Sequence, residues 1–434
     1  MTSYWCEQAI VGETVEHAVR IEESGGVIAA VVPEREPRDG DTVLSGLVLP
    51  GFANGHSHAF HRALRGRTHA DGGTFWTWRD EMYRVAGRLD PDSYFELATA
   101  VFAEMVLAGY TVVGEFHYLH RRPDGFAYET ATAMEDAVVA AAERAGIRLT
   151  LLDALYLAGG IGKELESSQS RFSDGSVADW VARRDAVQFG PLSRGGAAIH
   201  SVRAVHPHLF AAIRDASKSL PLHAHVSEQL AENEDSLAAY GATPTALLAA
   251  ADVLGPGFTA VHGTHLTDDD IQLLGGSGTT VCFCPTTERD LADGIGRASA
   301  LRQAGAALSL GSDQNAVIDP FEEIRGLEMD DRLASGRRGR FTPAQLLTAA
   351  TAGGYSSLGW NGGRLEIGAV CDLVEIEMTT PRTAGAAVDQ AWLAATSADV
   401  NTVVVGGVVR VRDGRHVLGD VGALLGEAIG RLNA

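Results

Sequence analysis

The sequence predicts an α/β protein: a (β/α)8 TIM-like barrel with a small β-sandwich domain built from both chain ends. From about residue 48 to residue 360, short β-rich runs alternate with helix-length amphipathic or alanine-rich stretches, as in parallel strands joined by helical crossovers. Eight such runs favour a closed barrel over an open doubly wound sheet, and no Gly-x-Gly-x-x-Gly follows a strand to suggest a dinucleotide site. A chain of 434 residues with 45% hydrophobic content can form one large domain and an accessory one.

The predicted barrel strands are short runs rich in apolar and β-branched residues. In chain order they are Val48–Phe52, Thr111–Phe116, Arg148–Leu155, Ala197–Val202, Leu222–Val226, Phe258–His262, Thr279–Cys284 and Ala307–Ser312. The helix candidates between them include Ser93–Ala108, Thr130–Ala145, Pro207–Lys218, Pro244–Leu254 and Thr267–Leu274. Because the active site of such a barrel lies at the C-terminal ends of its strands, we expect the functional residues there.

The two ends of the chain differ from this pattern. Residues 1–47 and 363–434 carry short alternating strands with turn signals, and we interpret them as one small β domain beside a barrel of residues 48–362. Residues 159–175, rich in Gly, Ser, Gln and Glu, follow the third predicted strand. They predict a long loop over the mouth of the barrel.

Composition excludes several classes of partner. The formal net charge of -21 argues against binding of nucleic acid and of an anionic membrane surface, which both need clustered Lys and Arg. The start of the chain shows no basic segment followed by an apolar one, and no apolar stretch approaches the ~18 residues of a spanning helix, so we expect a cytoplasmic protein. The four cysteines are too few and too scattered for a disulfide framework. Cys282 and Cys284 could form a metal pair, although the favoured interpretation is two small apolar residues in a buried run.

Candidate metal ligands follow four of the predicted strands. His56 and His58 lie at positions i and i+2, so their imidazoles can point to one side of the chain. A His-x-His pair alone is weak evidence and fits polar histidines in a turn better than a metal site, but His225, His262 and Asp313 stand at the ends of three other strands. Imidazoles with one carboxylate suit zinc, with iron or manganese also compatible, and leave a position open for water. Such a site favours hydrolysis of an electrophilic carbon. His223 shares a strand face with His225 and is an alternative ligand.

Longer segments around these residues carry a family resemblance over nearly the whole chain. The segments are Pro50 to Phe60, Phe75 to Arg79, Ala108 to Tyr118, His200 to Val205, His225 to Gln229, His262 to His265 and Cys284 to Glu288. They resemble the formimidoylglutamate deiminases of histidine degradation, within the amidohydrolase superfamily. The histidines and Asp313 identify only the superfamily, whereas Phe-Trp-Thr-Trp-Arg and Glu-Phe-His-Tyr narrow it to the deiminases.

The resemblance implies a metal site and a set of catalytic residues. It implies that one divalent ion is held by His56, His58, His225 and Asp313. Asp313 would also take a proton from the bound water, and Glu228 would shuttle a proton to the nitrogen that leaves as ammonia. His262 would orient the attacking water or stabilise charge at the tetrahedral carbon.

The implied substrate is N-formimino-L-glutamate, a small dianion derived from an amino acid. By resemblance, Arg79 and Arg203 are carboxylate clamps, Tyr118 and His200 add hydrogen bonds, and His61 stands where relatives commonly carry Gln. The two arginines could instead form structural ion pairs, since Asp80 and Glu81 lie nearby in the sequence. The family also implies a homodimer.

Two other functions remain open from the sequence. The first is another deaminase of the superfamily, acting on a heterocycle or a guanidine-like compound. The second is a non-catalytic scaffold that kept the barrel and lost the chemistry. A scaffold is expected to lack some of the metal ligands, whereas this chain has a candidate at each required strand end.

Overall fold

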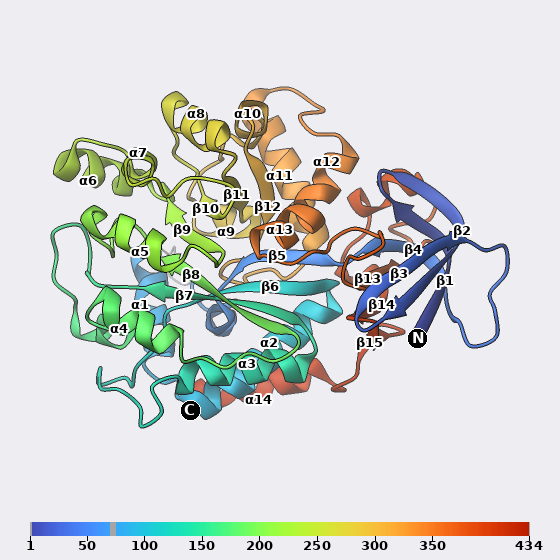
Figure 1. The fold of residues 1–434 in the computed structure, drawn as a ribbon, viewed down its shortest axis with the longest axis horizontal. Coiled ribbons are helices and arrows are strands. Elements are labelled where there is room, and N and C mark those ends of the chain that lie inside the picture. The colour runs from blue at the N-terminus through green and yellow to red at the C-terminus, as the bar shows by residue number, and fades with distance from the viewer. Residues whose placement is uncertain (1, 70–74, 434) are drawn as a thin grey trace.

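The computed structural model describes residues 2–69 and 75–433, with the side chains of residues 75 and 76 left out, and shows a barrel beside a separate β layer (Figure 1). Among the described residues the barrel sheet has eight parallel strands, each hydrogen-bonded to the next along the chain. They are β5 (Phe52–Ser57), β6 (Tyr110–His117), β7 (Arg148–Leu155), β8 (Ser193–Ile199), β9 (Leu222–Val226), β10 (Phe258–His262), β11 (Thr280–Phe283) and β12 (Ala307–Leu310). A parallel bridge between Ser57 and Asp313 brings the first strand against the end of the last. The predicted (β/α)8 barrel is therefore confirmed.

One predicted strand was wrong. The run Val48–Phe52 is not the first barrel strand, because β4 (Thr42–Pro50) belongs to the small sheet and β5 starts only at Phe52. The chain changes sheets at Gly51, whose N–H donates to the carbonyl of Asp372. A Cβ at Gly51 would lie 2.1 Å from the hydroxyl oxygen of Thr111, so this crossing has no space for a side chain. Pro50 and Gly51 mark the boundary, but the apolar residues on both sides of them made two buried strands look like one.

Helices cover the outside of the barrel (Figure 1). Those in the described ranges are α1 (Phe75–Ala86), α2 (Pro91–Leu107), α3 (Ala133–Ala145), α4 (Val177–Arg184), α5 (Phe210–Ala216), α6 (Leu230–Tyr240), α7 (Pro244–Ala250), α8 (Asp268–Ser277), α9 (Pro285–Asp290), α10 (Ala298–Ala304), α11 (Pro320–Ser335), α12 (Pro343–Thr348), α13 (Gly354–Ser357) and α14 (Val421–Asn433). Local signals set several ends: Asp90 caps α2 through the N–H of Ser93, and α3 stops at Gly146 in the left-handed conformation. None of these helices has the length and apolar composition that crossing a bilayer requires.

The small β domain predicted from both chain ends is also confirmed. Its strands are β1 (Thr2–Val11), β2 (Thr14–Ser24), β3 (Val27–Pro33), β4, β13 (Leu373–Ile376), β14 (Val400–Val405), β15 (Val408–Arg412) and β16 (Arg415–His416). They join into one continuous mixed sheet, in which β4 pairs with β13 and so links the two ends of the chain. After this sheet the chain returns to the barrel, where α14 packs against α2 (Figure 1).

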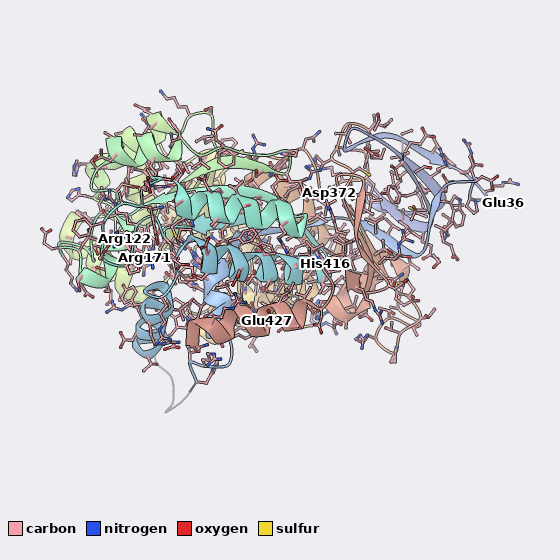
Figure 2. The ribbon with its side chains drawn as sticks, turned by 90° about the horizontal axis from the view of Figure 1, so that it is seen from below. Glu36, Arg122, Arg171, Asp372, His416 and Glu427 are labelled. Carbon is pink, nitrogen blue, oxygen red and sulfur yellow. The ribbon has the colours of Figure 1, made fainter. Side chains whose placement is uncertain are left out.

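A buried carboxylate joins the two domains. Asp372, just before β13, lies where the barrel meets the small sheet (Figure 2). It accepts hydrogen bonds from Arg148 Nε at 2.8 Å, from the Tyr355 hydroxyl at 2.5 Å and from the Gly406 N–H at 2.7 Å. Arg148 starts the barrel strand β7, so this cluster fixes the barrel to the small sheet.

We expect Asp372→Ala to lower the free energy of unfolding by about 3–5 kcal/mol, because it leaves the Arg148 guanidinium buried without its counter-ion. The control is Arg122→Ala, which breaks the exposed ion pair with Asp124 and is expected to cost less than about 1 kcal/mol. Urea denaturation followed by fluorescence compares the two. Equal midpoints would contradict a structural role for Asp372.

Candidate metal centre and pocket

The seam that closes the barrel brings the first candidate ligands together. The N–H of His58 donates to the carbonyl of Asp313 at 2.9 Å, and the N–H of Asp313 donates to the carbonyl of His56 at 3.0 Å. Beside these bonds, Ser312 exchanges hydrogen bonds with the Asn54 side chain, and Asn315 Nδ2 donates to the carbonyl of His58 at 3.0 Å. These hydrogen bonds hold the His-x-His segment and Asp313 together at one seam.

Four ligand-type side chains converge above this seam. His56 Nε2 lies 3.1 Å from His225 Nε2 and 3.4 Å from Asp313 Oδ1, and His58 Nε2 also lies 3.4 Å from Asp313 Oδ1. Donors about 2.0–2.1 Å from a tetrahedral ion lie roughly 3.3 Å from one another, so these separations fit neighbouring ligands of a cation. The ligand atoms fall into two groups that share His56, and within each group they lie within 4.8 Å of one another: His56, His58 and Asp313, and His56, His225 and His262. All four residues are buried. The donor set and its spacing fit a divalent metal ion.

Backbone carbonyls orient two of the imidazoles. His58 Nδ1 lies 2.9 Å from the carbonyl oxygen of Phe116, and His225 Nδ1 lies 2.9 Å from that of His200. Because a carbonyl only accepts, Nδ1 carries the proton and Nε2 presents its lone pair to the centre. Burial lowers the pKa of His58 to about 3 and that of His225 well below its usual value, which keeps both rings neutral. These neutral rings are suited to metal binding.

His262 differs from the other histidines. Its Nδ1 lies 3.4 Å from Glu288 Oε1, and its Nε2 lies 3.9 Å from Asp313 Oδ2, whereas His56 and His58 contact Asp313 through Oδ1. Burial lowers the pKa of His262, but the hydrogen bond to Glu288 and the charges of Glu228 and Asp313 outweigh it and raise the pKa to about 10. The arrangement places a cationic imidazole beside a cluster of neutral ones.

The backbone is strained at three of the strand ends. Ser227, His262 and Asp313 have φ values of 52°, 71° and 44°, in the left-handed region that non-glycine residues seldom occupy. They follow or end β9, β10 and β12. Such strain is concentrated at functional sites, where the surrounding structure holds it in place. Two of the three residues, His262 and Asp313, line the pocket at the barrel mouth.

A cavity of about 420 Å³ opens above the cluster. Its lining includes every predicted substrate-binding residue and most of the predicted ligands and catalytic groups: His58, His61, Arg79, Tyr118, His200, Arg203, His225, Glu228, His262 and Asp313. His56 is fully buried at the ligand cluster. The predicted mouth loop also contributes, through Gly159 to Ile161, Lys163, Gln169 and Phe172. The structure thus brings the sequence-predicted residues into one pocket next to the cluster of candidate metal ligands.

Three contacts in the pocket bear on recognition. The hydroxyl of Tyr118 lies 3.0 Å from His61 Nε2, so these two side chains form a polar pair on one wall. Arg203 forms an ion pair, but its partner is Glu228 at 2.7 Å and not Asp80 or Glu81. The guanidinium of Arg79 lies 5.5 Å from the centre of the Tyr83 ring.

The remaining candidates are His223, Cys282 and Cys284. His223 Nε2 bonds the carbonyl oxygen of Ser357 at 3.0 Å, a packing role on the strand that carries His225. Cys282 and Cys284 are both free and buried, as the apolar interpretation predicts. The Cys284 sulfur does come within 4.8 Å of ligand atoms of His262 and Asp313.

Sequence reasoning missed two buried carboxylates, Glu288 and Glu232. Glu288 holds both His262 Nδ1 and the N–H of Cys284. Glu232, the fourth residue after Glu228, lies 3.5 Å from Arg203 Nε. Glu232 lies on the first turn of α6, whereas Glu228 precedes that helix, so no helical spacing in the sequence indicated that both would face Arg203.

Comparison with known proteins agrees with this geometry. A family model described as "Amidohydrolase family" matches residues 47–410. The chain belongs to the amidohydrolase family. Within this family it is 36% identical to a formimidoylglutamate deiminase of Pseudomonas aeruginosa, over 96% of each chain. It is 29% identical to a 5-methylthioadenosine/S-adenosylhomocysteine deaminase of Natronomonas pharaonis, over 88% of this chain and 85% of the relative. A crystal structure of an amidohydrolase from Brucella melitensis superposes over the whole of both chains with a TM-score of 0.92 and 31% identity. This amidohydrolase is therefore an enzyme, a hydrolase of the deaminase type.

We expect His225→Asn to reduce the bound divalent metal to less than about a tenth of the wild-type content, because it removes one of four converging ligands. The matched control is His223→Asn, two residues earlier on the same strand, which is expected to keep the metal. Elemental analysis of protein purified without chelator gives the metal content per chain. Equal metal in both variants would contradict the assignment of His225.

Proposed function

We propose that this amidohydrolase is a formimidoylglutamate deiminase that hydrolyses N-formimino-L-glutamate to N-formyl-L-glutamate and ammonia, a reaction of histidine degradation. The observation that carries the proposal is the pairing of a metal-type ligand cluster with cationic side chains in one pocket of an otherwise acidic protein. Arg79 and Arg203 both line this pocket. The similarity to the deiminase of Pseudomonas aeruginosa supports the same substrate.

We propose zinc as the metal, with iron or manganese as the alternatives, because neutral imidazoles and one carboxylate are ligands that suit these ions. His56, His58, His225 and Asp313, the set that the family resemblance implies, would hold it, since His56 lies close to both His225 and Asp313 and His58 lies close to Asp313. When bound, the ion supplies a Lewis acid that activates water near neutral pH.

The protein's own side chains supply the proton transfers. Asp313, whose Oδ2 faces His262, is placed to take a proton from the attacking water. Glu228 lines the pocket and can deliver a proton to the terminal nitrogen, so that its bond to carbon breaks and ammonia leaves. His262, held by Glu288, presents positive charge beside the oxygen of the tetrahedral intermediate, where negative charge develops. Water contributes the oxygen of the resulting formyl group.

The pocket walls supply recognition of a small dianion. The two carboxylates of the substrate would be met by Arg79 and Arg203, since a guanidinium can bind a carboxylate through two parallel hydrogen bonds. Tyr118, His61 and His200 add polar contacts. A cavity of about 420 Å³ is within the usual range for small-molecule sites.

The second candidate function is deamination of a heterocycle. The similarity to the 5-methylthioadenosine/S-adenosylhomocysteine deaminase and the aromatic wall of Trp78, Tyr83 and Tyr156 favour it. The presence of both Arg79 and Arg203 in the pocket favours the dianion as substrate.

We also propose that the enzyme works in the cytoplasm, because its four cysteines are buried and free, as in proteins of a reducing compartment. The expected homodimer stays a prediction.

We expect the purified enzyme to release ammonia from N-formimino-L-glutamate and not from guanine, cytosine or S-adenosylhomocysteine. Coupled detection of ammonia measures all four substrates under the same conditions. Turnover of a heterocycle without turnover of N-formimino-L-glutamate would overturn the proposed function and support the second candidate. Folded, metal-loaded protein inactive on all four would also overturn it.

We expect Arg79→Met and Arg203→Met each to lower kcat/KM for N-formimino-L-glutamate by about a hundredfold, because each removes a charge-assisted contact to a carboxylate. Steady-state kinetics measures the loss, and Arg122→Met, an exposed arginine, is the control. If both pocket variants kept the wild-type kcat/KM, the clamp assignment would be wrong even with the activity present.

A further inference from the structure

Arg203 is held between two glutamates. Its Nη2 donates to Glu228 Oε2 at 2.7 Å, and its Nε lies 3.5 Å from Glu232 Oε2. All three side chains line the pocket. The guanidinium that we assign to a substrate carboxylate is therefore already occupied by the residue that we assign to proton transfer.

The two glutamates differ in how firmly they are held. The side chain of Glu232 is completely buried, on the first turn of α6, and its Oε1 lies 3.4 Å from the N–H of Ser227. Glu228 precedes α6 and keeps 12% of its side chain exposed to the pocket. Of the two partners of Arg203, Glu228 is the one that has space to move away.

A substrate carboxylate would compete with Glu228 for the same cation. Two glutamates against one arginine already leave the group with an excess negative charge, and a third carboxylate would increase it at close range. Repulsion between carboxylates at one guanidinium favours the departure of the most mobile one. Glu232 stays beside Arg203 Nε, so the guanidinium keeps its position during the exchange.

We propose that Arg203 couples substrate binding to catalysis: it holds Glu228 in the free enzyme, and the carboxylate of the substrate displaces Glu228 so that it can transfer protons. This inference rests on the proposed function. Arg203 would then determine specificity in two ways: it binds the substrate carboxylate, and it releases Glu228 only when that carboxylate is present. An amidine without the carboxylate leaves Glu228 bound to Arg203. The penalty then falls on kcat as well as on KM.

The test compares N-formimino-L-glutamate with N-butylformamidine, which has the same reacting group and no carboxylate. Wild-type enzyme should turn over N-butylformamidine with a kcat at least about a hundredfold lower, the order of a lost charge-assisted contact. Arg203→Gln should raise kcat for N-butylformamidine by about tenfold, because Glu228 is released, while kcat/KM for N-formimino-L-glutamate falls. A merely structural role for Arg203 would lower both.

Glu232→Gln provides a second variant with the opposite effect. Of the two glutamates that contact Arg203, this variant keeps only Glu228 as a carboxylate, so Arg203 should hold Glu228 more tightly. We therefore expect kcat for N-butylformamidine to fall further, by about fivefold. Lys163→Gln, which removes another cation lining the pocket, should not raise kcat for N-butylformamidine. The comparison separates release of Glu228 from a general loss of positive charge.

The coupling and the proposed function can fail separately. Equal wild-type kcat values for the two amidines, or no gain of kcat for N-butylformamidine in Arg203→Gln, would overturn the coupling while activity on N-formimino-L-glutamate stands. A wild-type enzyme inactive on both amidines would overturn the proposed function itself.

Discussion

The candidate site depends on the seam between the first and last strands of the barrel. Two backbone hydrogen bonds between the His56–His58 segment and Asp313 hold this seam, and they also bring the ligands together. The approach is close enough to require glycine at position 311, where a Cβ would lie 2.7 Å from the carbonyl oxygen of His56. The same hydrogen bonds thus close the barrel and bring the candidate metal ligands together. A chain that left this seam open would lose the cluster together with the fold.

Much of this arrangement could be predicted from the sequence. Parallel strands in a barrel end at one mouth, so His225, His262 and Asp313 could be grouped with His56 and His58 before any coordinates were known. The first strand was misplaced because an apolar run continues from β4 into β5 without a polar residue to mark the change. The order of strands in a barrel was enough to predict which ligands meet. Local hydrophobicity was not enough to predict where every strand begins and ends.

Side-chain partners could not be predicted in the same way. Arg203 and Glu228 lie 25 residues apart on different loops, and their contact depends on how both loops follow their strands. Glu288 looks like a solvated helix residue in the sequence, since it begins a short polar stretch, yet it is buried against His262. Carboxylates that orient a catalytic cation have no pattern of their own. Their burial, which the fold alone decides, distinguishes them from surface charges.

The two sides of the pocket are built differently, which agrees with a mobile Glu228. Tyr118 lies in the sequence between His117 and His120, which both bond Glu135, at 3.0 and 2.8 Å. Burial would raise the pKa of Glu135, but Arg183 and the two imidazoles hold it below its usual range. Every ionic partner in that network is buried, so moving one would leave another charge uncompensated at a cost of several kcal/mol. Separating Arg203 from Glu228 should cost less free energy, because both side chains are partially exposed. We therefore expect exchange of ionic partners only on the side of the pocket where Glu228 transfers the proton.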